Sequence, residues 1–423
     1  MFEEEGPVEL SDHFFRRESG RIVAALTRIF GVHNLALAED VVQDAFCRAL
    51  EVWKARGVPE NPSAWLMATA KNRALDVLRR ERTARTFAPE MGRLLETEWT
   101  IAPIVDEAFA AHTIRDEQLR MMFSCCHPRL PDEAQVALIL NILCGFGARE
   151  IASAFLTGRA AIEKRISRGK KVLASARTLF DLADAEFDSR LSTVRRALYL
   201  LFNEGYHGAS GEATVRVELC SEAIRLTALL REHPPADTPA TNALAALMCL
   251  HAARLPARID SAGDLNSLVV QDRSRWDARL MAEGLALLER SAAGTELTAY
   301  HIEAAIAAEH ASAGSLEETD WGSIVSLYDR LMDTAPSPVV ALNRAIAVAE
   351  RDGAERGLEE LHAIADRDRL SSYPFYPAAI GELELRRGDR ESARRHFQSA
   401  LSLARSATES RFLEKRLRCC DGE

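Results

Sequence analysis

Six cationic side chains crowd the thirteen residues from Arg159 to Lys171, where Glu163 is the single carboxylate. Guanidinium and ammonium groups at this density can bind phosphates and donate hydrogen bonds to base edges. Laid out at 100° per residue, the apolar and small residues fall on one stripe: Ile162, Ile166, Gly169 and Leu173. The other side carries Ala160, Lys164, Ser167 and Lys171, with Arg168 on one flank. This pattern predicts a helix suited to a DNA major groove, although a solvated basic surface helix is the alternative.

Two preceding elements would position this basic helix. An apolar helix is expected from about Ala134 to Cys144, and Gly145 and Gly147 end it. A short amphipathic helix over 149–155 follows, and the turn 156–158 leads into the basic helix. Helix, three-residue turn and basic helix form a helix-turn-helix pattern, which favours DNA binding over the solvated alternative.

A second candidate surface lies between Ser63 and Arg85. Asn61 suits a helix N-cap and Pro62 the first turn, so a helix should begin there. Its core-facing residues are expected to be Met67, Ala70, Ala74, Leu75 and Leu78. Its other face carries Trp65, Thr69, Asn72, Arg73, Asp76, Arg79 and Arg80. Cations, an aromatic ring and an amide together can hold single-stranded DNA, although Trp65 could equally plug the core edge beside solvated arginines.

Two further helices are expected before this surface. The first covers residues 10–30, and the second covers Leu35–Trp53. In the second, a four-three-four spacing buries Val42, Phe46, Ala49 and Trp53. The remaining face is acidic and polar: Asp40, Gln43, Asp44, Arg48 and Glu51. Such a face is either solvated or a docking surface for a basic partner helix.

Three of these segments together resemble a known family. AEDVVQDAFCRALEVW (38–53), NPSAWLMATAKNRALDVLRRERTAR (61–85) and the segment 132–173 resemble, in order and spacing, bacterial RNA polymerase sigma factors of the extracytoplasmic-function type. The resemblance covers residues 1–176. It implies that the first segment grips the polymerase clamp helices, that the second melts and reads the promoter −10 element, and that the third reads the −35 element.

The resemblance also implies roles for individual residues. It places Asp40, Gln43, Asp44 and Arg48 near the polymerase clamp. It places Asn72, Arg73, Asp76, Arg79 and Arg80 near the −10 strand, and Trp65 shares their face. It places Arg159, Lys164, Arg165, Ser167, Arg168 and Lys171 on the −35 duplex. Arg165 flanks the buried stripe, so we expect it to contact a phosphate rather than a base. Ala160 and Ala161 stand where such proteins often carry Ser or Thr, which leaves the −35 preference open.

Composition limits the class of protein. The chain has 423 residues, of which 47% are hydrophobic, and Ala, Leu, Arg and Glu favour helices. Residues 1–176 contain 24 basic and 24 acidic side chains, so the net charge of −10 falls entirely in the remainder. An acidic C-terminal part could mask the basic helices or dock a partner. The N-terminus shows no signal peptide, and the longest uncharged apolar run is too short for a bilayer. Eight cysteines without a C-x-x-C spacing favour reduced thiols, and we expect a cytoplasmic protein.

Three further segments could carry chemistry or contact polymerase. Cys125, Cys126 and His127 are poorly spaced for one tetrahedral metal, so we expect helix packing and no metal site. Residues 202–208 read as a loop in which Glu204 and His207 could form an acid–base pair, although a loop that caps two helices explains them too. Residues 86–115 are either a disordered linker or a segment threaded through polymerase, and the resemblance implies the latter.

The C-terminal half shows an internal repeat. At an offset of 36 residues, Gly357, Leu361 and Ile364 match Ala393, Phe397 and Ala400. A small residue followed by large or small apolar ones at four and three is typical of tetratricopeptide-like helix pairs. Charged residues at 272–279 could form salt bridges inside such an array or a surface for the N-terminal part. With FNEGY and QDRSRWD, the array resembles sigma factors that carry a long helical C-terminal extension.

The sequence therefore predicts an all-α fold with two small helical sigma domains, the second a helix-turn-helix, and a helical, tetratricopeptide-like extension. The expected boundaries are 1–88, a linker 89–115, 116–178 and 179–423, with repeats from about 300. The expected function is promoter-specific initiation with core RNA polymerase and promoter DNA, regulated in cis by the extension, which would bind a protein or small-molecule signal. No cofactor, membrane contact or enzymatic activity is expected. The alternative is a helix-turn-helix regulator that recruits polymerase without melting DNA.

Overall fold

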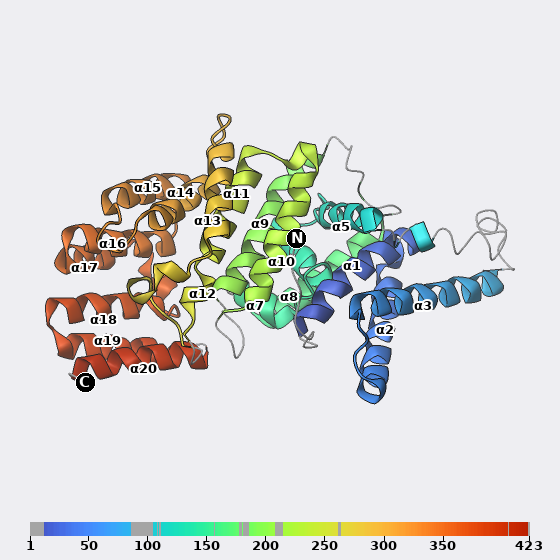
Figure 1. Cartoon of the computed structure of the whole chain (residues 1–423), viewed down its shortest axis with the longest axis horizontal. Helices are drawn as coiled ribbons and strands as arrows, with labels where there is room; N and C mark the ends of the chain where they lie inside the picture. Colours follow the sequence, from blue (N-terminus) through green and yellow to red (C-terminus); the bar gives the residue numbers. More distant parts are fainter. Residues whose placement is uncertain are drawn as a thin grey trace. The chain divides into compact units, whose positions relative to one another are not determined.

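The structure is a computed structural model that describes residues 12–85, 105–107, 109, 111–155, 157–176, 180, 186–207, 215–260, 264–404 and 406–421. Within these ranges the regular structure is helical, apart from one isolated β-bridge between Ile259 and Leu265. The expected all-α fold is confirmed (Figure 1). The chain forms two compact units, Met1–Leu201 and Phe202–Glu423.

The first unit begins with three long helices. They are α1 (Asp12–Phe30), α2 (Leu35–Arg56) and α3 (Pro62–Arg85), and the short 3-10 helix η1 (Val32–Asn34) joins the first two. The Asn61 carboxamide oxygen accepts a hydrogen bond from the Ala64 amide at 2.9 Å, so the expected cap of α3 is present. On α3, Leu66 is fully buried, whereas Met67, expected in the core, is half-buried. The core-facing stripe therefore lies one residue earlier at this end.

Four shorter helices follow in the same unit: α5 (Ala111–Cys125), α6 (Asp132–Ile142), α7 (Ala148–Ala154) and α8 (Arg159–Ala174). Helix α6 is buried along most of its length, because α5, α7 and α8 all pack against it. Gly145 has φ of +65°, a conformation that L side chains rarely adopt, and an added Cβ would meet the Arg16 side chain at 2.9 Å. The glycine after α6 thus both permits the turn and lets α1 approach.

Helix α9 (Phe187–His207) corrects one expectation. Residues 202–207 were expected in a loop, but they continue this helix. The helix carries a glycine at position 205 because a larger residue would not fit. An added Cβ would lie 2.8 Å from the Cys220 amide nitrogen and 2.9 Å from the Arg216 carbonyl oxygen. Close packing against the start of the next helix, which local sequence does not reveal, decided this segment. Glu204 and Tyr206 are buried as a result.

The second unit continues through a series of helices, most of which pack on their neighbours in the chain. They are α10 (Val217–Glu232), η2 (Pro234–Ala236), α11 (Pro239–Ala252), α12 (Leu255–Arg258), η3 (Leu268–Val270), η4 (Arg273–Arg275), α13 (Ala278–Ser291), α14 (Ala299–Ser312), α15 (Trp321–Thr334), α16 (Pro338–Asp352), α17 (Ala354–His362), η5 (Arg367–Leu370), α18 (Phe375–Arg387), α19 (Arg390–Ser402) and α20 (Ala407–Asp421). Figure 1 shows α16 beside α17 and α18 beside α19.

The repeat at an offset of 36 corresponds to these last helix pairs. Leu361 at the end of α17 and Phe397 on α19 are both fully buried, and Gly357 and Ala393 occupy equivalent buried positions. An added Cβ on Gly357 would lie 2.3 Å from the Ala349 Cβ atom, so α17 packs closely on α16. Small residues at these positions allow each helix to approach its predecessor.

Candidate nucleic-acid interface

Helix α8 buries the four residues that its periodicity predicted: Ile162, Ile166, Gly169 and Leu173. Gly169 lies against Leu138 of α6, and an added Cβ would come within 2.7 Å of a Leu138 methyl group. Helices α6 and α7 thus fix both the rotation and the depth of α8. The opposite face of α8 is presented outward as a rigid surface.

Five of the six cations of α8 divide into two groups, and the sixth, Lys170, pairs with Glu39 of α2. Arg159 pairs with Glu163 at 2.7 Å, and Arg165 pairs with Glu133 of α6 at 2.8 Å. Exposed side chains make up the second group: Lys164, Ser167, Arg168 and Lys171. Among the described residues, no carboxylate pairs with the three cations of this second group. These side chains can therefore contact an anionic partner without first breaking an ion pair.

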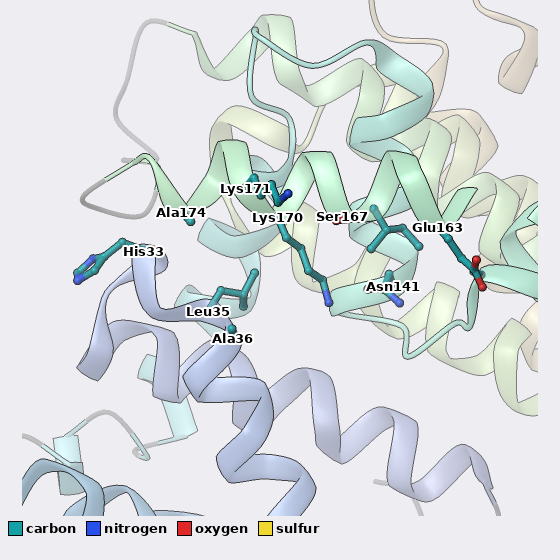
Figure 2. A pocket seen from close by; sticks show the side chains of 11 residues that line it. His33, Leu35, Ala36, Asn141, Glu163, Ser167, Lys170, Lys171 and Ala174 are labelled. Carbon is teal, nitrogen blue, oxygen red and sulfur yellow. The ribbon is translucent and has the colours of Figure 1, made fainter. Parts of the chain in front are cut away.

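A groove of about 560 Å³ runs beside α8. Figure 2 shows His33 of η1, with Leu35 and Ala36 at the start of α2, across from Ser167, Lys170 and Lys171 of α8. Lys170 crosses toward α2 and donates to both carboxylate oxygens of Glu39, at 2.7 and 2.9 Å. Two of the expected −35 residues, Ser167 and Lys171, thus line this groove, and η1 and the start of α2 form its opposite wall.

On α3 the expected −10 residues lie along one side and differ in their exposure to solvent. Asn72, Asp76, Arg79 and Arg80 are exposed. Trp65 is half-buried, and its ring meets the edge of Trp53 with centroids 5.3 Å apart. The indole is therefore held by the aromatic cluster of the core and still presents part of its surface. Asp76 lies 3.7 Å from Arg79, which is a loose surface pair.

On α2 the expected polymerase-contacting residues Asp40, Gln43, Asp44 and Arg48 are all exposed. Arg73 of α3 pairs with Asp44 at 2.8 Å, which joins the expected −10 face to the expected polymerase face. Both side chains keep more than a third of their surface open, 38% and 54%, so the pair is solvent-screened and can exchange partners. The two predicted surfaces are adjacent in space.

Sequence reasoning missed the Glu39–Lys170 contact. Lys170 was one cation among six and Glu39 an ordinary helix-surface carboxylate, and 131 residues separate them. No local pattern marks such a pair, because only tertiary packing brings its members together. Similarly, Phe187 at the start of α9 stacks on Phe123 of α5 with centroids 4.3 Å apart, a contact between residues 64 positions apart in the chain.

The Cys125–Cys126–His127 segment is a packing element in the structure. Both thiols are buried, and burial raises the pKa of Cys126 to about 12. Its Sγ donates to the Met122 carbonyl oxygen. Within the described ranges, no group of three His, Cys, Asp or Glu side chains is arranged to hold a metal ion, and no helix is both long and apolar enough to cross a membrane. The threaded segment expected at 86–115 lies largely outside the described residues.

Comparison with known proteins agrees with this geometry. Residues 14–84 match Sigma-70 region 2, residues 120–173 match Sigma-70 region 4, and residues 190–292 match a family of unknown function. An uncharacterized protein of Rhizobium meliloti (strain 1021) is 39% identical over 93% of this chain and 92% of its own length. RNA polymerase sigma factor CarQ of Myxococcus xanthus is 30% identical over 40% of this chain and 90% of its own length. The chain therefore belongs to the sigma-70 family of RNA polymerase sigma factors, and its exposed polar surfaces on α2, α3 and α8 lie within the two matched regions.

Proposed function

We propose that this chain directs promoter-specific initiation as a sigma factor of the extracytoplasmic-function type. The family implies binding of core RNA polymerase and promoter DNA. The observation that carries the finer proposal is α8, which buries its predicted stripe and leaves Lys164, Arg168 and Lys171 exposed and unpaired among the described carboxylates. A helix held this way supports a role in −35 readout.

Residue roles follow from the exposed faces. We assign −35 contacts to Lys164, Ser167, Arg168 and Lys171, with Arg159 and Arg165 as phosphate contacts that exchange their intramolecular carboxylates. We assign −10 contacts to Trp65, Asn72, Arg73, Asp76, Arg79 and Arg80. We assign polymerase contacts to Asp40, Gln43, Asp44 and Arg48. The functional domains would be 1–88, 116–178 and 179–423, and these contain the three matched segments.

The extension would regulate initiation in cis. Its support is the charge division, in which residues beyond 176 carry the whole excess of acidic side chains. Successive packed helix pairs with small residues at equivalent positions support a tetratricopeptide-like array, which presents a surface for a protein or small-molecule signal. An array of this kind binds more often than it catalyses.

Run-off transcription tests this proposal, with core polymerase, the full-length chain and its own upstream DNA as template. We expect a discrete transcript that the double variant Arg79→Ala, Arg80→Ala loses. The regulation is tested with residues 1–201, which correspond to the first compact unit and retain the Phe187–Phe123 stack. Transcript levels that are the same with and without the extension would contradict cis regulation, provided that both proteins are folded by circular dichroism.

A recruiter that does not melt DNA is the competing function. The exposed side of α3 argues against it, because a recruiter has no need for amide, arginine and indole groups along one face. Permanganate reactivity of thymines in the −10 region separates the two. Reactivity that appears with polymerase and this protein supports melting. Polymerase recruitment without reactive thymines supports the recruiter.

A further inference from the structure

Two arginines of the second unit lie on one face of a helical turn. Arg254 is the N-cap of α12 and Arg258 ends it, and the Arg258 amide donates to the Arg254 carbonyl oxygen at 3.0 Å. Residues four apart on a helix are neighbours, with Cβ atoms about 5–6 Å apart. Both side chains are half-buried, and the charge of Arg258 acts on the Arg254 guanidinium group, so the two charges lie within electrostatic range of one another.

Aromatic rings hold both guanidinium groups in place. Arg258 lies over the Tyr206 ring at 4.1 Å from its centroid, and Arg254 lies over the Trp276 ring at 5.4 Å. The Arg254 Nε donates to the Gln271 carboxamide oxygen at 3.3 Å. Stacking fixes the plane of a guanidinium group and leaves its outer nitrogens available. The two forks are therefore oriented before any ligand arrives.

Carboxylates do not neutralise this pair within the described residues. Neither Arg254 nor Arg258 forms an ion pair there, and the buried Arg258 Nε has no hydrogen-bond partner. The nearest acidic residues along the chain are engaged otherwise, since Asp260 accepts from the Asp264 amide and Asp264 pairs with Arg411. Unpaired charge that is partly removed from water is costly, so this arrangement favours an added anion.

A third arginine increases the positive charge. Arg273 lies over the Trp276 ring at 5.1 Å, and it donates to the carbonyl oxygens of His310 and Ala313 and to the Thr319 hydroxyl. Arg273 therefore provides hydrogen bonds to carbonyl groups at the C-terminal end of α14. These acceptors are neutral, so they do not cancel its positive charge. Burial lowers the pKa of Arg254, and the charges of Arg258 and Arg273 lower it further, whereas Tyr206 raises it. The guanidinium groups thus repel one another in the absence of a ligand.

We propose that Arg254 and Arg258 form a binding site for a small oxyanion, the phosphate or carboxylate group of a metabolite. Planar guanidinium forks bind such groups through paired, charge-assisted hydrogen bonds. Because both side chains are half-buried, only part of each guanidinium group is open to a ligand, which suits a compact anionic group. This inference deepens the regulation proposed above by naming the chemistry of a signal, and it rests on that proposal for its biological meaning only. Its test measures binding, so the two can fail separately.

Thermal unfolding of the full-length protein provides the test, with inorganic phosphate or citrate added at constant ionic strength set by chloride. A ligand that binds only the native state raises its Tm progressively, with the logarithm of the ligand concentration once that concentration exceeds Kd. We expect Arg254→Gln and Arg258→Gln to weaken the apparent affinity at least about tenfold. Arg258→Lys, which keeps the charge and loses the fork, should fall between. Arg351→Gln is the matched control, because Arg351 is exposed and already paired with Asp352.

The readout is the ligand-dependent change in Tm, so a lower starting stability of a variant does not obscure it. A rise in Tm with phosphate alone identifies a phosphate group, and a rise with citrate alone identifies carboxylates, and either supports the site. No concentration-dependent rise in Tm with either anion overturns it. An unchanged response in both Arg254→Gln and Arg258→Gln overturns it as well. Isothermal titration with phosphate on the same proteins gives an independent affinity.

Discussion

Lys170 of α8 donates to both carboxylate oxygens of Glu39 on α2, which ties the matched region 4 to the matched region 2. A second ion pair joins Arg16 of α1 to Glu150 of α7 at 2.8 Å. The Lys170 pair lies beside the groove that Ser167 and Lys171 line. A major groove is about 12 Å wide, so a duplex needs open space on this face of α8. We therefore expect the pair to separate when α8 binds DNA.

Glu39→Gln should strengthen DNA binding by the free protein. The pair is about one-third exposed, 30% and 31%, so its loss should change affinity by up to about fivefold. Fluorescence anisotropy with duplex DNA from upstream of its own gene measures this. Glu51→Gln is the control, because it makes the same change in net charge on the exposed face of α2. Equal gains in the two variants would leave no role for the Lys170 contact.

Gly169→Ala should destabilise the first unit by about 1 to 2 kcal/mol, because its Cβ would crowd Leu138 beyond what better helix propensity offsets. Gly158→Ala is the control, since nothing lies within 4 Å of a Cβ there and its φ of −76° suits any residue. Chemical denaturation followed by circular dichroism gives the free energies. Similar values for both variants would show that α8 is not closely packed at Gly169.

Lys164→Ala and Arg168→Ala should each weaken duplex binding uniformly across sequences, because each removes an exposed cation that can contact the DNA phosphates. Each lost contact should reduce the slope of log affinity against log salt by about one. Arg129→Ala, an exposed cation outside α8, should leave the slope unchanged. Anisotropy titrations at several salt concentrations measure it. A sequence-dependent loss would instead indicate base readout.

Labelling of the native Cys47 thiol should report polymerase binding, so no cysteine has to be introduced. It is exposed on the same face of α2 as Asp44 and Arg48, whereas burial raises the pKa of Cys126, Cys220 and Cys249 to about 12 and keeps those thiols protonated. We expect maleimide to label Cys47 first and core polymerase to protect it. Partly exposed Cys419 serves as the internal control in mass spectrometry. Unchanged labelling of Cys47 in the complex would exclude this face from the contact.

The second unit should lose stability between pH 6.5 and pH 4. Burial, with the charges of Arg254 and Arg273, lowers the pKa of His310 to about 4. In this window the unfolded chain binds a proton that the folded chain does not, so the free energy of unfolding falls as pH falls. The loss should reach about 2 to 3 kcal/mol at most. Denaturation at several pH values checks it. His310→Gln should flatten the dependence, and exposed His362→Gln should not.

Local sequence determined the helices and their faces in the first unit. The buried stripe of α8 follows from a 100° rotation per residue, and the Asn61 cap follows from a side chain that bonds an amide three residues away. Both depend on neighbours within one or two turns. That is why the exposed basic face of α8 could be predicted from the sequence. On α3, Ala70 and Ala74 are buried as expected, whereas the first core position is Leu66 and not Met67, because neighbouring helices decide burial there.

Tertiary structure decided the contacts between distant segments. The helical course of residues 202–207 depends on Gly205 meeting the start of α10, although a glycine amid Asn, Tyr and His reads locally as a loop. Three contacts join residues between 22 and 131 positions apart only through packing: the Lys170–Glu39 pair, Arg254 over Trp276 and Arg258 over Tyr206. Ion pairs and ring contacts depend on distances in the folded chain. Sequence periodicity predicts which face of a helix is buried, but it does not predict which distant residue that face contacts.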